Sequence, residues 1–182
     1  AQLSGSGDLS VDQIQAEKTS VTMSGPGEVS LAGETKVFVL RMSGSGNFDA
    51  SRLRVMDADV RNSGPGDLDL KTVHGNLTID HSGSGEAQID MAAAGHIELN
   101  SDGPGTINLR GSGKKMNAIL NGSGDLHAAE LVLDEASVKV NGPGEASVNV
   151  KAAVETHKSF CRFCHAVCGI EELWIADARL CG

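Results

Sequence analysis

Four cysteines and one histidine near the C-terminus are the residues of this chain whose types best suit metal binding. Cys161, Cys164 and His165 fit the Cys-x-x-Cys-His pattern, in which two cysteines attach a haem and the histidine binds its iron. Zinc is an alternative, with four ligands drawn from Cys161, Cys164, Cys168, and Cys181 or His165, although their spacing fits no standard zinc framework. Disulfide bonds between the four cysteines are equally compatible with an exported protein. We predict no cofactor and keep these five residues as candidate metal ligands.

A second candidate site is a column of acidic residues, each placed three residues after the first glycine of a recurring Gly-Ser-Gly or Gly-Pro-Gly phrase. The column reads Asp8, Glu28, Asn47, Asp67, Glu86, Thr106, Asp125 and Glu145. Carboxylates stacked about 4.8 Å apart could bind Ca²⁺, which takes several oxygen ligands. Alternatively, each acid accepts hydrogen bonds from the N–H groups of its own turn. Asn47 and Thr106 favour the second interpretation, because a ladder of calcium ligands should not tolerate them.

The phrases themselves predict the architecture that positions these residues. Their first glycines are Gly5, Gly25, Gly44, Gly64, Gly83, Gly103, Gly122 and Gly142, so the spacing alternates between 20 and 19 residues. A fixed period in this range is typical of a solenoid, in which each unit buries its apolar face against its neighbours. We attribute the phrases to turns in which glycine adopts a positive φ.

Within each unit the apolar pattern is that of β-strands. Leu68 and Leu70, for example, lie four and six residues after Gly64, with the polar Asp69 between them. Similar alternation precedes each phrase, and no helical periodicity is sustained through the repeats. The sequence therefore predicts an all-β fold over residues 1–159: a parallel β-helix, or β-solenoid, of about eight coils. Parallel crossovers are right-handed, so we expect a right-handed helix. We expect one coil per 19 or 20 residues, with one coil per 39 residues as the alternative.

Composition restricts the function. A formal net charge of −9 argues against partners such as nucleic acids and anionic membranes, and no apolar run approaches the ~20 residues of a transmembrane helix. Aromatic residues, on which sugars commonly stack, make up only 3% of the chain. The histidines of the repeats fall at different places in the unit and form no column: His74, His81, His96 and His127. We predict that the chain is not an enzyme and has no catalytic residues.

The phrases and their spacing resemble the bacterial GIN-domain family of autotransporter adhesin heads. The matching stretches are 4–9, 24–29, 43–48, 63–68, 82–87, 102–107, 121–126 and 141–146. The first phrase begins at Ser4, so the chain resembles the later part of such a domain. The resemblance implies an exported β-helix of the periplasm, outer membrane or cell surface, with a surface glycan or protein as partner. We predict a non-catalytic, adhesin-like or scaffolding role; the alternatives are a carbohydrate-active lyase or hydrolase and a calcium-binding surface module.

Residues 160–182 depart from the repeats. The expected phrase at 160–163 is replaced by Phe-Cys-Arg-Phe, and the only tryptophan of the chain, Trp174, follows. One interpretation is a helical cap, whose apolar face would comprise Ile170, Leu173, Trp174, Ala178 and Leu180. Such a cap would cover the open end of the solenoid. The other interpretation is a non-native extension of the repeats.

Overall fold

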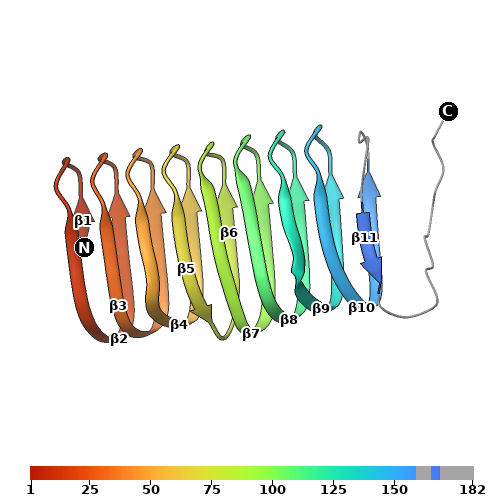
Figure 1. The fold of residues 1–182 in the computed structure, drawn as a ribbon, viewed down its shortest axis with the longest axis horizontal. Helices are drawn as coiled ribbons and strands as arrows, with labels where there is room; N and C mark the ends of the chain where they lie inside the picture. Colours follow the sequence, from red (N-terminus) through yellow and green to blue (C-terminus); the bar gives the residue numbers. More distant parts are fainter. Residues whose placement is uncertain (159–164, 169–182) are drawn as a thin grey trace.

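The computed structural model describes residues 1–158 and 165–168, which form β-strands and their connecting loops (Figure 1). The strands are β1 (Gln2–Leu3), β2 (Leu9–Met23), β3 (Val29–Met42), β4 (Phe48–Asn62), β5 (Leu68–Val73), β6 (Leu77–His81), β7 (Glu86–Ser101), β8 (Thr106–Leu120), β9 (Leu126–Val140), β10 (Ala146–Lys158) and β11 (His165–Cys168). The all-β prediction is confirmed. No helix long and apolar enough to cross a membrane occurs in the described part of the chain. The predicted helical face from Ile170 to Leu180 lies outside the described residues.

The strands form one sheet, with every described pairing parallel. Leu9 of β2 pairs with Val29 of β3, and Val29 pairs with Phe48 of β4, so each strand lies beside the equivalent strand of the next unit. One unit is therefore one coil, and the 39-residue alternative is wrong. The eight phrases bound seven complete turns, and β10 begins an eighth. At the far end, β11 pairs with the first part of β10, as a further coil would.

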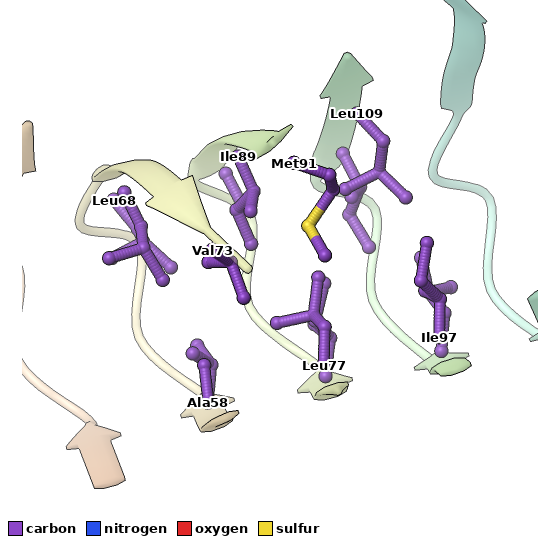
Figure 2. Close-up of a cluster of buried hydrophobic side chains, with 14 of the residues drawn as sticks. Ala58, Leu68, Val73, Leu77, Ile89, Met91, Ile97 and Leu109 are labelled. Carbon is purple, nitrogen blue, oxygen red and sulfur yellow. The ribbon is translucent and has the colours of Figure 1, made fainter. Parts of the chain in front are cut away.

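The core is a set of apolar columns that run along the inside of the rod. The residues four and six places after each first glycine are buried from the second unit onward, as in Leu68 and Leu70. Leu9 and Val11 of the first full coil are only half-buried. Figure 2 shows such side chains from both sides of the coil meeting in the interior, Leu68 and Ile89 from one side and Leu77 and Ile97 from the other.

The glycine phrases form loops that all lie along one edge of the rod (Figure 1). Positive φ angles are not the reason for these glycines: among the described glycines only Gly33 and Gly111, which lie outside the phrases, adopt them. Instead, a Cβ atom on Gly64 would overlap the carbonyl oxygen of Gly44 in the preceding coil, and a Cβ on Gly44 would overlap that of Gly25. The phrases therefore need glycine because the loops stack too closely for any side chain.

The difference in unit length lies at the opposite edge of the rod. In the 19-residue units, the eighth residue after the first glycine has a positive φ: Gly33 (131°), Thr72 (78°) and Gly111 (105°). The 20-residue units place their additional residue near this corner, where the strand registers shift, for example between Met91 and Ala94 of β7. Gln13, the eighth residue after Gly5 in the first 20-residue unit, also has a positive φ (62°), so this conformation is not confined to the shorter units; it is one that favours glycine.

A third inward column, two residues before each phrase, was not predicted from the sequence. It reads Met23, Met42, Asn62, His81, Ser101, Leu120 and Val140, all buried. Its polar centre bonds to the glycine loops: Asn62 Nδ2 donates to the Gly66 carbonyl (3.0 Å), and Asn62 Oδ1 accepts from the Gly64 N–H (3.0 Å). His81 Nε2 lies 3.1 Å from the Gly85 carbonyl oxygen, which can only accept, so Nε2 carries the hydrogen.

Thr72 is expected to be a strained position. A β-branched residue at a φ of 78° is unfavourable, and the equivalent residues of the other two 19-residue units that the phrases enclose are glycines. We expect Thr72→Gly to raise the free energy of unfolding by about 1 kcal/mol, the relief of strain exceeding the entropy of a more flexible unfolded chain. Urea denaturation measures this change. The matched control is Gly111→Thr, which should destabilise, and a loss of stability in Thr72→Gly would contradict the assignment.

His81 should make stability depend on pH. Burial lowers the pKa of His81 below its ordinary value of 6.5, and the hydrogen bond to Gly85 only partly opposes this effect. As the pH falls through about 6.5, the unfolded chain therefore takes up a proton that the folded chain resists, and the free energy of unfolding decreases. Denaturation at a series of pH values, compared with His81→Met, tests this. Met42 occupies the same column, so the variant should fold and lose this part of the pH dependence.

Candidate binding surface

The acidic column lies at the surface, along the edge that carries the glycine loops. Its aspartates bond to the neighbouring coil: Asp8 Oδ1 accepts from the Glu28 N–H (2.9 Å). The same contact joins Asp67 to Glu86 (2.8 Å) and Asp125 to Glu145 (2.8 Å). The expectation that these acids bond to turn N–H groups is confirmed for these three aspartates, but the turn is that of the next coil. These three aspartates therefore tie successive glycine loops together.

The residues proposed as metal ligands are only partly described. Within the part of the chain that the structure describes, no three or more histidine, cysteine, aspartate or glutamate side chains are grouped so as to hold a metal ion. Cys161, Cys164 and Cys181 lie outside the described residues. His165 and Cys168 lie in β11, of which the strand alone is described. Metal binding by these residues, or by the acidic column, stays a prediction.

The structure separates His74, His81, His96 and His127. His74 and His96 are exposed on the edge opposite the glycine loops, His127 is exposed on β9, and His81 is buried in the core. Their lack of a common column was expected from the sequence.

A groove of about 560 Å³ lies on the edge opposite the glycine loops, over β2, β3, β4 and the loop between β5 and β6. It is lined by Gln15, Ala16, Glu17, Glu34, Thr35, Lys36, Arg54, Val55, Met56 and His74. The parallel register arranges most of them in rows along the rod. Ala16, Thr35 and Val55 are paired neighbours and form a floor; Gln15, Glu34 and Arg54 form one wall. We call this feature the corner groove.

The charges of the corner groove are paired within its walls. Glu34 lies 3.6 Å from Arg54 in the first wall. In the second wall, which consists of Glu17, Lys36 and Met56, Glu17 lies 2.8 Å from Lys36. Each wall therefore carries one cation that can donate hydrogen bonds and one carboxylate that can accept them, and the net charge of each wall is zero.

The corner groove also exposes apolar surface. Met56 is 50% exposed, whereas Val55 beside it is 1% exposed and continues the core. The Thr35 hydroxyl is buried: it accepts from Thr19 (3.0 Å) and donates to the Val37 carbonyl (3.2 Å). Sequence analysis missed this site, because its residues become neighbours only when three coils stack; an outward methionine and an inward threonine were the available signals.

Removing an inter-coil carboxylate should weaken the rod by about one hydrogen bond. We expect Asp125→Ala to lower the free energy of unfolding by about 1 kcal/mol, because the Glu145 N–H loses its acceptor. Asp125→Asn keeps an acceptor oxygen and should remain close to the original chain. If the column were instead a calcium ladder, Ca²⁺ but not Mg²⁺ would raise the melting temperature of the original chain, and Asp125→Asn would reduce that shift.

The comparisons with known proteins agree with the repeat architecture. The family described as "Putative auto-transporter adhesin, head GIN domain" matches residues 1–89 and, overlapping them, 71–159. No curated protein and no solved structure matches the chain. Because the two family matches together cover all the glycine phrases, the chain belongs to the auto-transporter adhesin head GIN-domain family.

Proposed function

We propose that this chain is a non-catalytic, exported domain of the cell envelope or cell surface that acts as an adhesin-like or scaffolding rod. The observation that carries the proposal is the family match over residues 1–159. Its partner is a surface glycan or protein. The net charge of −9 supports this choice over nucleic acid, and the absence of cysteine from residues 1–159 is compatible with an oxidising compartment.

The surface of the rod fits a role in contact with other molecules. Ion pairs join neighbouring coils on exposed side chains, as between Arg110 and Glu130 (3.1 Å) and between Lys115 and Glu135 (3.4 Å). Such exposed pairs contribute little to stability. They do keep the long flat faces polar, which disfavours uncontrolled pairing between rods.

The carboxylates of the corner groove support a binding role over hydrolysis. A glycosidase uses two carboxyl groups flanking the bond to be cleaved, and its general acid is commonly shielded from water so that it stays protonated. Glu17 and Glu34, in contrast, are 81% and 69% exposed and each lies beside a cation. Neither carboxyl group therefore has the water-shielded environment that a general acid uses.

Adhesion and turnover distinguish the proposal from the lyase or hydrolase alternative. Beads coated with the full chain should be retained on bacterial or host cell surfaces, whereas beads coated with heat-unfolded chain should not. The same chain should release no reducing ends or unsaturated sugars from a panel of polysaccharides. Turnover that is abolished by Glu17→Gln or Glu34→Gln would decide for an enzyme, and absence of retention on every surface would contradict adhesion.

A further inference from the structure

We propose that the corner groove binds a neutral oligosaccharide, with the sugar chain lying along the rod axis. This inference rests on the proposed surface-binding function and specifies the ligand and its site. The groove volume of about 560 Å³ falls within the usual range of small-molecule sites, roughly 300–1,000 Å³. Its rows repeat once per coil, so a ligand along the axis meets equivalent side chains at intervals of about 4.8 Å.

The electrostatics of the groove favour an uncharged ligand. The pairs Glu17–Lys36 and Glu34–Arg54 cancel within each wall, so no net charge is left to attract an ion. The net charge of −9 on the whole chain further disfavours anionic ligands at long range. A neutral ligand is therefore selected by hydrogen bonding and shape.

Hydroxyl groups match what the walls offer. Each hydroxyl can donate and accept, so the same sugar can bond to the carboxylates of Glu17 and Glu34 and to the cations of Lys36 and Arg54. The exposed side chain of Met56 provides apolar contact for the C–H face of a sugar ring. A combination of apolar contact and a few convergent polar groups is the usual composition of a ligand site.

The backbone of the groove argues against an extended peptide. Peptides commonly bind by adding a strand to a free sheet edge. Here the strands of the floor already pair with one another across β2, β3 and β4, and the free sheet edge nearest the groove is the outer side of β2, where only Thr22 and Met23 pair with β1. At the end of the groove the His74 N–H donates to the Val55 carbonyl (2.9 Å), and the Gly75 N–H donates to the Met56 carbonyl (2.7 Å). Between β2 and β4 recognition must therefore come from side chains, and a peptide that pairs with the outer side of β2 is the competing outcome that the tetrapeptide probes measure.

The remainder of this edge lacks the same walls. At the two wall positions β7 carries Ala93 and Gly95, and β8 carries Ser112 and Lys114, so the first wall has no long side chain there. Two walls of long side chains thus face each other over β2 to β4, the strands that Figure 1 shows on the N-terminal side of the β5–β6 loop. This asymmetry within a repetitive rod makes the groove a localised site.

Methionine methyl NMR of the full chain tests the proposal, because Met56 is exposed while Met23, Met42, Met91 and Met116 are at most 2% exposed. The probes are neutral tetrasaccharides of glucose, mannose and N-acetylglucosamine, a tetragalacturonate and uncharged tetrapeptides, each at millimolar concentration. At least one neutral tetrasaccharide should shift the Met56 resonance and leave the four buried methionines nearly unchanged. The proposal is overturned if no neutral tetrasaccharide shifts it, or if tetragalacturonate or the peptides shift it more strongly.

A pair of matched variants confirms the location. Lys36→Gln with Met56→Ala should weaken calorimetric binding of the active tetrasaccharide about tenfold or more. The control, Lys115→Gln with Ile119→Ala, removes an ion-paired lysine and a 40% exposed apolar side chain elsewhere and should change affinity by less than about twofold. Equal affinity in both variants overturns the proposal. If beads carrying the groove variant still adhere to cells, the proposed adhesive function stands but does not depend on the groove. If beads carrying the original chain adhere to no surface, the proposed adhesive function is wrong. The sugar titration then still shows whether the corner groove binds a neutral oligosaccharide.

Discussion

The parallel stacking of one coil on the next is the constraint on which the rest of this structure depends. Strands of successive coils lie about 4.8 Å apart, so any atom that points along the rod axis meets its own equivalent in the neighbouring coil. At the loop edge this leaves no room for a Cβ atom: one on Gly64 would overlap the Gly44 carbonyl oxygen. The repeated glycines thus reflect contact between coils. The aspartates beside them, such as Asp125, use the same proximity to bond to the next loop.

The stacking of the coils also determines which departures from the repeat the rod can accommodate. The shorter units omit a residue at the far corner and have a positive φ there, which Gly33 and Gly111 adopt readily and Thr72 adopts at a cost; Gln13 of the first, longer unit shares this conformation. In the core, the column from Met23 to Val140 contains Asn62, His81 and Ser101. Asn62 and His81 are accommodated because they bond to the carbonyl groups of the glycine loops above them. The interior is therefore coupled to the loop edge by side chains as well as by the backbone.

The corner groove arises from the same stacking. Each coil contributes only a short run, such as Glu34, Thr35 and Lys36, which has no binding capacity by itself. Three coils in register convert these runs into a floor and two walls with internally paired charges. The β5–β6 loop, with His74, closes the far end. A repetitive rod can thus carry a localised site without departing from its backbone geometry.

Glycine spacing and period-2 alternation, which are local properties of the chain, were enough to predict the solenoid, one strand-rich coil per phrase, and the burial of columns such as Leu68 and Leu70. The sequence by itself misassigned the reason for the glycines and did not find the inward column of His81, since Asn, His and Ser break an apolar pattern unless their bonds to the loops are known. The corner groove and the partner of each aspartate were decided by the tertiary structure alone. Both depend on contacts between residues that are about 19 or 20 positions apart in the sequence and lie in neighbouring coils. The register that brings such residues together is fixed by the backbone pairing of the strands and by the alternating corners.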